Sequence, residues 1–289
     1  MTRMLIFGLG YTASRIATRL ERARWRVTAT RRQADSDALA FDDEDRVRAA
    51  IATATHILSS VPPDGDGRDP VLDRYAAMLR DAPARWFGYL SSTGVYGDTA
   101  GAWVDESAAI GTGRRSARAE ADAAWTALRR DVHVFRLPGI YGPGRSTLER
   151  IVDGRAQRID LPDQVFSRVH VDDIAEAVCA SFARGPAGVY NLADDRPASQ
   201  NAVIEEACRL LSMPPPPLRT LEGAGLSPMA RGFYAENRRV ANGKAKRLLG
   251  WTPRFADYRA GLADCLARSA TNSPASDSSP PTAAAIDQR

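Results

Sequence analysis

The chain has 289 residues, of which 44% are hydrophobic and 26% are charged, and its formal net charge at pH 7 is +4. This ordinary globular composition excludes a chain that is disordered over most of its length. The charge excess is too weak to indicate a nucleic-acid-binding surface, and no apolar run approaches the roughly 18 residues that a membrane helix needs. We therefore expect neither a nucleic acid nor a membrane as a partner.

The cysteines and histidines are few and dispersed. Cys179, Cys208 and Cys265 are far apart and form no Cys-x-x-Cys pair. The sequence therefore predicts neither a metal site nor a disulfide framework. Free thiols are typical of a reducing compartment, which favours a cytoplasmic protein. The apolar stretch near the N-terminus is only as long as a strand, so we do not expect a signal peptide.

The first 140 residues alternate short apolar runs with helical patterns. Strands are expected at residues 4–7, 26–30, 38–41, 55–60, 86–91 and 132–137. Apolar residues at helical spacing predict helices at 12–24, 70–81 and 115–129. Repetition of strand, helix and strand predicts an α/β fold with a doubly wound parallel sheet, covered by helices on both faces.

The pattern is less regular after Pro138. We expect a strand at residues 189–192 and helices at 171–183, 199–211, 241–249 and 256–267. Residues 268–289 are rich in Ser, Pro and Ala and show no apolar period. Such a segment cannot bury enough surface to offset its ordering entropy, so we predict a disordered tail.

A glycine-rich turn follows the first expected strand. Its sequence, Gly8-Leu9-Gly10-Tyr11-Thr12-Ala13, leads directly into a helix. In a Gly-x-Gly-x-x-Ala turn, the first glycine permits the tight turn and the second lets backbone amides approach a pyrophosphate. The alanine lets the helix pack closely on the strand, and the helix N-terminus faces the anion. The segment therefore predicts a dinucleotide-binding, Rossmann-type domain rather than a merely structural turn.

The end of the second strand bears on the choice of cofactor. Thr30 is followed by Arg31 and Arg32, where NAD-binding sites place an acid for the ribose hydroxyls, about 20 residues past the glycine-rich turn. Threonine followed by arginines suits a 2′-phosphate instead, so NADP is favoured. If these are simply two more surface arginines, NAD remains the alternative.

Two further positions are expected to lie along the same cofactor. Asp42 follows the third expected strand, where it either accepts a hydrogen bond from the adenine amino group or is an ordinary turn residue. Ser60 ends the fourth strand next to Ser59. The chain passes close to the cofactor there, and we expect the contact to be mostly through the backbone.

Five later motifs follow in a specific order and spacing. They are Leu90-Ser91-Ser92-Thr93-Gly94-Val95-Tyr96-Gly97, the segment 136–145 (RLPGIYGPGR), the segment 169–175 (VHVDDIA), the segment 189–192 (VYNL) and the segment 248–253 (LLGWTP). Over residues 3–267 the chain resembles an extended short-chain dehydrogenase/reductase of the NAD-dependent epimerase/dehydratase family. The resemblance implies a dinucleotide-binding domain at residues 1–140, to which residues 165–192 return. A smaller substrate-binding portion would then occupy most of residues 141–267.

In that family a serine or threonine, a tyrosine and a lysine carry the chemistry, because the tyrosine moves a proton while hydride moves to or from the nicotinamide. The resemblance places the hydroxyl residue at Ser92. The tyrosine and lysine positions fall on Thr112 and Ser116, and no Tyr-x-x-x-Lys occurs anywhere in the chain. The chain is therefore more similar to atypical members, with a non-standard or degenerate catalytic site.

Other groups could supply the proton, each with a simpler structural alternative. Tyr96 is usually structural in the family. Asp105 and Glu106 either face the cleft or cap the next segment. Tyr141 precedes Arg145 by four residues, but arginine is a poor proton relay. Water or the substrate itself remains as a further source.

Two residues are candidates for contact with a substrate. The planar guanidinium of Arg145 suits a phosphate or carboxylate, although the residue could instead stabilise its loop. The resemblance places His170 beside the cleft, where it either contacts the substrate or is a structural histidine with satisfied hydrogen bonds. Asp172 and Asp173 open a helix and are predicted to cap it.

These observations predict an NAD(P)-binding, epimerase/dehydratase-like oxidoreductase that acts on a small polar substrate, as a monomer or a homodimer. The alternative is a non-catalytic NADP(H)-binding sensor or scaffold. The missing tyrosine and lysine bear on this choice, because a sensor needs no proton relay. Residues 195–235 are expected to line the substrate pocket, but their composition indicates no substrate.

Overall fold

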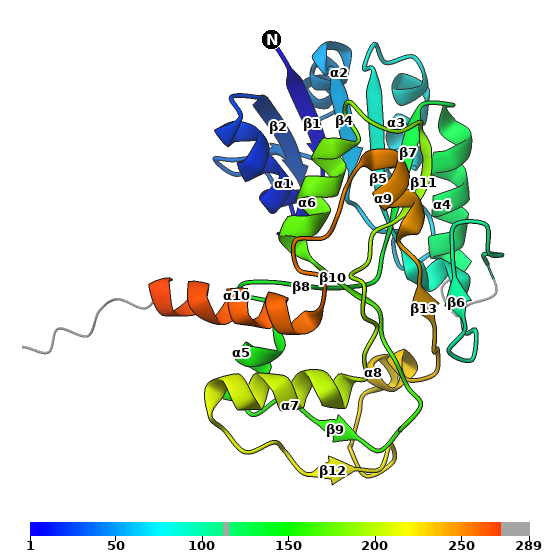
Figure 1. The fold of residues 1–289 in the computed structure, drawn as a ribbon. Coiled ribbons are helices and arrows are strands. Elements are labelled where there is room, and N and C mark those ends of the chain that lie inside the picture. The colour runs from blue at the N-terminus through cyan, green and yellow to red at the C-terminus, as the bar shows by residue number, and fades with distance from the viewer. Residues whose placement is uncertain (112–115, 273–289) are drawn as a thin grey trace, which may run out of the picture.

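The computed structural model describes residues 1–111 and 116–272, and a seven-stranded parallel sheet forms its frame (Figure 1). The order along the sheet is β11-β7-β5-β4-β1-β2-β3. The strands are β1 (Arg3–Phe7), β2 (Arg26–Arg31), β3 (Leu39–Ala40), β4 (His56–Ser59), β5 (Trp86–Ser92), β7 (Val132–Leu137) and β11 (Gly188–Asn191). The chain starts in the middle of the sheet and changes direction between β1 and β4, which confirms the predicted doubly wound Rossmann-type sheet.

Helices bury both faces of this sheet, because successive side chains of a strand point to opposite faces. On one face, Met4 and Ile6 pack with α1 (Tyr11–Arg22), α6 (Val171–Ala180) and α9 (Gly243–Leu249). On the other face, Leu5 and Phe7 pack with α2 (Glu44–Thr53), α3 (Pro70–Arg80) and α4 (Ser116–Leu128). The central strands β1 and β4 are therefore buried along nearly their whole length, whereas β2, closer to the edge of the sheet, is only partly buried.

Among the described α-helices of the first 140 residues, α2 is the one that the sequence pattern does not predict. Its only buried side chains are Val47 and Ile51, and two apolar residues within a charged run give a weak helical signal. The helix is instead fixed at its start, where the Asp43 side chain accepts a hydrogen bond from the amide of Arg46 at 3.3 Å.

A second portion of the chain lies beneath the carboxyl ends of the strands (Figure 1). Its core joins α5 (Thr147–Val152), α7 (Gln200–Leu211) and α10 (Tyr258–Asn272), and a short helix, α8 (Pro228–Phe233), lies nearby. Three two-stranded parallel ribbons complete it or connect it to the sheet. They pair β8 (Gly139–Tyr141) with β10 (Arg168–His170), β9 (Arg158–Ile159) with β12 (Leu218–Arg219), and β6 (Trp103–Val104) with β13 (Arg239–Val240).

The C-terminal helix is longer than the sequence pattern predicts. Helix α10 runs to Asn272, five residues past the expected end at 267 and into the segment predicted as a tail. Residues 273–289 lie outside the described residues, as do Thr112 and the first residue of the helix predicted at 115–129. Across residues 1–111 and 116–272, no helix has both the length and the apolar character needed to cross a membrane.

Candidate functional site

The glycine-rich segment forms the turn between β1 and α1 at the carboxyl edge of the sheet. Gly8 has a φ of 83°, and a Cβ atom there would lie 2.9 Å from Cγ2 of Val61 and 3.1 Å from Oγ of Ser60. The hydroxyl of Ser60 donates a hydrogen bond to the Gly8 carbonyl at 2.6 Å. The amide of Gly8 donates to Oγ1 of Thr30 at 3.2 Å. Glycine is therefore required at this position by both backbone conformation and space.

The second glycine of the turn faces open space. A Cβ atom on Gly10 would meet nothing within 4 Å. Gly10 is the N-cap of α1, where no described side chain caps the helix and no acidic residue lies in the first turn. The Thr12 and Ala13 side chains are buried, so only their amides can face this space. Uncapped amides at a helix N-terminus are suited to a pyrophosphate.

The end of β2 differs from expectation at one residue. Thr30 is fully buried, and its hydroxyl accepts a hydrogen bond from the Gly8 amide, so its side chain stabilises the turn. Arg31 and Arg32 are exposed beyond it, and Arg31 forms an ion pair with Asp35. Asp42 is also exposed, beyond the end of β3. The arginines are accessible to a phosphate group at the place where the sequence predicts one.

A cavity of about 790 Å³ lies between the carboxyl ends of β5 and β7 and the second portion of the chain. Its polar lining at the sheet comes from Ser92 and Thr93, and its opposite wall comes from α5, α8 and the segments around them. The charged residues of the lining are Arg145, Glu149, Arg150, Arg155, Arg168, Glu236 and Arg238. Five guanidinium groups against two carboxylates make this an anion-binding environment.

Ser92 is placed at the sheet end of this cavity. It caps the short 3₁₀-helix η1 (Thr93–Tyr96), where its Oγ atom accepts a hydrogen bond from the amide of Gly94 at 3.1 Å. Because the oxygen already accepts, the hydroxyl hydrogen is what Ser92 can offer to a ligand in the cavity. The sequence prediction for Ser92 is thus compatible with its position.

The three alternative proton donors do not face the cavity with a free acidic group. The Tyr96 hydroxyl donates to Oδ1 of Asn191 at 2.7 Å within the core, and burial raises its pKa. Asp105 accepts from the amide of Ser107 at 2.9 Å. Glu106 accepts from the amide of Asn191 at 2.8 Å. All three side chains hold the local structure, which was the simpler alternative for each of them.

Tyr141 lines the cavity, but its hydroxyl is directed against α10. A Cβ atom on Gly261 of that helix would lie 2.0 Å from the Tyr141 hydroxyl, and the backbone carbonyl of Asp257 lies 3.5 Å away from it. Burial raises the pKa of Tyr141 well above its ordinary value. The residue therefore packs the two portions of the chain together and is a poor proton donor.

The two glutamates of the lining are also engaged. Glu149 accepts hydrogen bonds from the amides of Ser146 at 2.7 Å and Gly144 at 3.1 Å. Burial alone would raise the pKa of Glu149, but the hydrogen bonds from Ser146 and from nearby backbone amides hold it below its ordinary value. Glu236 pairs with Arg238 at 2.9 Å. Neither carboxylate is therefore directed into the cavity without a partner.

Tyr11 and Arg145 connect the glycine-rich turn to the cavity. The Tyr11 hydroxyl donates a hydrogen bond to the backbone carbonyl of Pro143 at 3.1 Å. The guanidinium carbon of Arg145 lies 5.6 Å from the centre of the Tyr11 ring, within the range of a cation–π contact. Arg145 itself is exposed and lines the cavity. The two predicted binding regions are thus adjacent in space.

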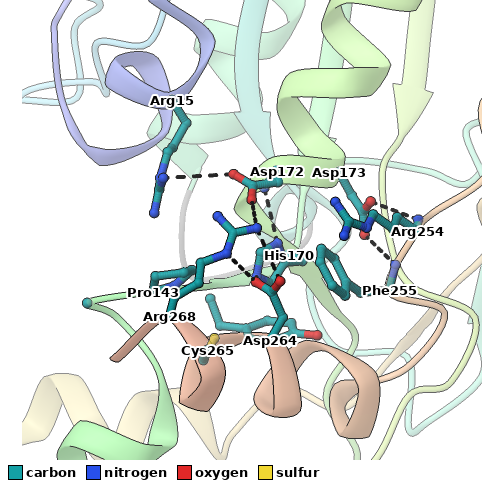
Figure 2. A network of polar contacts seen from close by, with 12 residues as sticks. Arg15, Pro143, His170, Asp172, Asp173, Arg254, Phe255, Asp264, Cys265 and Arg268 are labelled. Atoms are coloured by element: carbon teal, nitrogen blue, oxygen red, sulfur yellow. Dashed lines mark hydrogen bonds and ion pairs between the residues drawn. The ribbon is translucent and has the colours of Figure 1, made fainter. Parts of the chain in front are cut away.

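The structure corrects the expectation that His170 contacts a substrate. His170 is fully buried and does not line the cavity. It caps α6, because its Nδ1 atom accepts a hydrogen bond from the amide of Asp172 at 3.2 Å. Its ring packs against Phe255 at 4.0 Å between ring centres, and its Nε2 atom lies 3.6 Å from Oδ2 of Asp264 (Figure 2). It is therefore a structural histidine, but its hydrogen bonds are not all satisfied as expected, because Nε2 has no hydrogen-bond partner among the described residues.

An ion-pair network surrounds this histidine (Figure 2). Arg268 bonds to Asp172 at 2.8 Å and to Asp264 at 2.9 Å, which joins α6 to α10. His170, Asp172 and Asp264 lie close enough together to be considered as metal ligands. However, Nδ1 of His170 accepts an amide hydrogen, so the proton of the neutral ring is on Nε2. Arg268 already supplies the cation, so the cluster is an ion-pair network.

The aspartate next in sequence caps another segment instead of its own helix. The Asp173 carboxylate accepts hydrogen bonds from the amides of Arg254 at 2.8 Å and Phe255 at 3.1 Å. It thereby fixes the chain that leads into α10. The predicted helix-capping role belongs to His170 and not to Asp173.

The three buried histidines make a contribution to the free energy of unfolding that depends on pH. Burial lowers the pKa of His56 and of His170 to about 4, from an ordinary value of 6.5, and it also lowers that of His133. The unfolded chain then takes up protons first as the pH falls below 6.5. The stability that these neutral histidines contribute is complete above that value and is lost progressively toward pH 4. Burial raises the pKa of Asp194 to about 8 and that of Asp173 to about 6, which acts in the opposite direction, so the histidine contribution is measured as a difference between variants.

His133 offers a matched test of this pH dependence. Its ring stacks on Trp86 at 5.6 Å between ring centres. The variant His133→Phe keeps an aromatic ring in the stack and removes one titrating group, so its midpoint should depend less steeply on pH. A His133→Phe midpoint that depends on pH as steeply as that of the wild type would contradict the prediction.

Comparison with known proteins places the chain in a family. A functionally unknown conserved protein from Silicibacter pomeroyi has a solved structure that is 42% identical in sequence, with a TM-score of 0.85. The similarity covers 93% of this chain and 99% of that one. The chain belongs to the family of this protein. No protein-family model matches the chain.

More distant similarities extend beyond this family. A 3-diazoavenalumate denitrifying reductase from a Streptomyces species is 32% identical over 140 residues, which is 45% of this chain and 45% of the reductase. The match therefore spans less than half of that relative. The human epimerase family protein SDR39U1, solved with NADPH, is 15% identical, with a TM-score of 0.74, over 91% of this chain and 99% of that one. Solved epimerases and dehydratases share the fold, which confirms the predicted resemblance at the level of the fold.

Proposed function

We propose that the chain binds a nicotinamide dinucleotide across the β1–α1 turn and uses it to reduce or oxidise a small anionic substrate in the adjoining cavity. The observation that carries the proposal is the pairing of an uncapped, glycine-lined helix N-terminus at Gly10 with an arginine-rich cavity, connected through Tyr11 and Arg145. The NADPH in the related human structure supports it, and so does the reductase named among the relatives.

The proposal assigns one task to each part of the chain. The first turn of α1 holds the pyrophosphate by its amides, as part of a cofactor domain at residues 1–140 to which residues 165–192 return. Residues 141–267 mostly bind the substrate, with Arg145 on its anionic group. When bound, the nicotinamide gives or takes the hydride. The Ser92 hydroxyl donates a hydrogen bond to a substrate oxygen and holds it in place.

Calorimetric titration of the purified chain with NADPH and with NADH tests the proposal directly. Binding of either at micromolar concentration supports it. The proposal fails if neither binds at millimolar concentration, because the turn and cavity would then have another role.

We also propose that NADP(H) is preferred over NAD(H), because Arg31 and Arg32 are exposed at the end of β2. The variant Arg31→Ala is expected to weaken NADPH binding about tenfold, the effect of one charge-assisted hydrogen bond, and to leave NADH binding within about threefold. Arg26→Ala, at the opposite end of the same strand, is the control and should change neither. An equal loss for both cofactors would contradict the preference.

A non-catalytic sensor or scaffold is the second candidate function. Within the described residues, no lysine, histidine or aspartate side chain lines the cavity, and a binding protein would need none. This candidate predicts tight NADPH binding without hydride exchange at the nicotinamide, whichever substrate is offered.

A further inference from the structure

The end of the cavity at Ser92 offers a hydrogen-bond donor but no general acid. No lysine, histidine or aspartate of the described chain lines the cavity. Glu149 accepts hydrogen bonds from backbone amides, Glu236 pairs with Arg238, and the Tyr141 hydroxyl lies against α10. Tyr234 also lines the cavity, and burial raises its pKa, which makes it a weaker acid. The four residues outside the described range at 112–115 are Thr, Gly, Arg and Arg, none of which is an acid. The Ser92 hydroxyl can stabilise an oxyanion, but it cannot release a proton at neutral pH.

Reduction of an isolated carbonyl is poorly matched to such a site. Hydride addition to a ketone gives an alkoxide, which must be protonated as it forms, and a positioned acid typically provides 10²–10⁴-fold of the rate. Hydride addition to a double bond conjugated with a carbonyl gives an enolate instead. Because its charge is delocalised, an enolate needs only hydrogen-bond stabilisation at oxygen. Water can then deliver the proton to carbon.

The far wall of the cavity indicates the rest of the ligand. Phe233 is 51% exposed, and it adjoins Tyr234, whose ring meets Phe166 at 5.8 Å between ring centres. These three aromatic side chains line the cavity together with Arg150. Arg150 is exposed and forms no ion pair within the described residues. Aromatic faces beside a guanidinium suit a flat molecule that carries an anion.

We infer that the substrate is a planar, anionic compound with a carbon–carbon double bond conjugated to a carbonyl, and that the enzyme reduces this double bond. The inference rests on the proposed function and specifies its substrate class. Hydride from the reduced nicotinamide forms a C–H bond at the carbon β to the carbonyl. The π electrons move to the carbonyl oxygen, which Ser92 holds as the enolate. A proton from water then adds to the α carbon, so that one substrate, one NADPH and one proton give the saturated ketone and NADP⁺.

Benzoylacrylate is a suitable probe, because it combines an aromatic ring, an enone and a carboxylate. Benzoylpropionate has the same ring, ketone and acid without the double bond. We expect NADPH-dependent turnover of benzoylacrylate to exceed that of benzoylpropionate about 100-fold, with benzoylpropionate as the product. Deuterium from NADPH labelled at nicotinamide C4 should appear β to the ketone, and deuterium from D₂O should appear α to it. Side reaction with thiols is limited, because Cys208 and Cys265 are buried, Cys179 is partly buried, and burial raises the pKa of Cys179.

Substitution of Arg150 tests recognition of the anionic group separately from hydride transfer. Arg150→Met should lower kcat/KM for benzoylacrylate about tenfold and leave that for its uncharged methyl ester within about twofold. Arg130→Met, an exposed residue that does not line the cavity, should change neither value.

The outcomes distinguish this inference from the proposed function on which it rests. Reduction of benzoylacrylate at its carbonyl, equal turnover of benzoylpropionate, or bound NADPH that is consumed by neither compound would overturn the inference. Binding of NADPH would still support the cofactor site in each of these cases. Only a failure to bind NADPH or NADH would overturn the proposed function as well.

Discussion

Replacing Gly10 by aspartate is expected to weaken NADPH binding about 100-fold or more while making the free protein slightly more stable. Gly10 has φ −90° and ψ −170°, an extended conformation open to any residue, and a Cβ atom there meets nothing within 4 Å. An aspartate at this N-cap can accept hydrogen bonds from the first-turn amides of α1 and interact favourably with the helix dipole. It should therefore stabilise the free protein by about 0.5–1 kcal/mol.

The same carboxylate would occupy the amides that the proposed pyrophosphate needs and would repel it. A 100-fold loss corresponds to about 2.7 kcal/mol of binding free energy, which is reasonable for the loss of several charge-assisted hydrogen bonds. Opposite changes in stability and affinity are the signature of a residue that matters only when the cofactor is present. Calorimetric titration and urea unfolding of one preparation measure both quantities.

Gly10→Asn is the matched control, because asparagine caps a helix about as well as aspartate but carries no charge. Its loss of affinity should lie between those of the wild type and of Gly10→Asp. If Gly10→Asp binds NADPH as tightly as the wild type, the cofactor does not lie over this turn.

The glycine-rich turn is the part of the candidate site whose structure the sequence predicts best, because its motif is made of neighbouring residues. Six consecutive residues after a strand define the turn, and the structure places Gly8 and Gly10 where the motif requires. The hydrogen bond between the Thr30 hydroxyl and the Gly8 amide could not be predicted, because the two residues are far apart in the sequence. Thr30 lies 22 residues from Gly8, and only the parallel pairing of β1 with β2 turns its hydroxyl toward the Gly8 amide.

The cavity could be predicted only in part. Ser92 and Arg145 belong to recognisable motifs, but Arg150 and Phe233 lie on helices of only six residues each, and no spacing in the sequence relates them. Both line the cavity, because α5 and α8 both lie in the second portion of the chain, beneath the carboxyl ends of the sheet (Figure 1). His170 was misplaced for a similar reason, since burial by Phe255 and α10 depends on a segment about 85–100 residues further along the chain.

Asp122→Asn is expected to reduce the free energy of unfolding by about 3–5 kcal/mol, the typical cost of leaving a buried charge without its partner. Asp122 is 1% exposed and accepts from Nη2 of Arg136 at 2.7 Å and from Nε of Arg136 at 3.0 Å. Ser91 donates to the same carboxylate at 2.6 Å. Burial alone would lower the pKa of Arg136, and the Asp122 carboxylate raises it again. Asparagine has nearly the same shape, so the loss reports the charge and not a cavity.

Two comparisons isolate the buried charge as the cause. Asp131 pairs with Arg129 in equally good geometry, with contacts of 2.8 Å, but its side chain is 41% exposed. Asp131→Asn should therefore cost at most about 1 kcal/mol. Replacing both buried partners, in Asp122→Leu with Arg136→Met, removes the unpaired charge and should recover most of the stability lost by Asp122→Asn. This comparison remains informative even if the single variant does not fold.

The Asp122–Arg136 ion pair also supports the segment that carries Ser92. Arg136 also donates to the Tyr96 hydroxyl at 3.0 Å, so the pair anchors the end of η1, the short helix whose first turn Ser92 caps. In the double variant the protein should fold and bind NADPH through the distant β1–α1 turn, while η1 is held less firmly. The turnover of benzoylacrylate should then fall, while the affinity for NADPH stays unchanged. If turnover is also unchanged, Ser92 does not need the network beneath it.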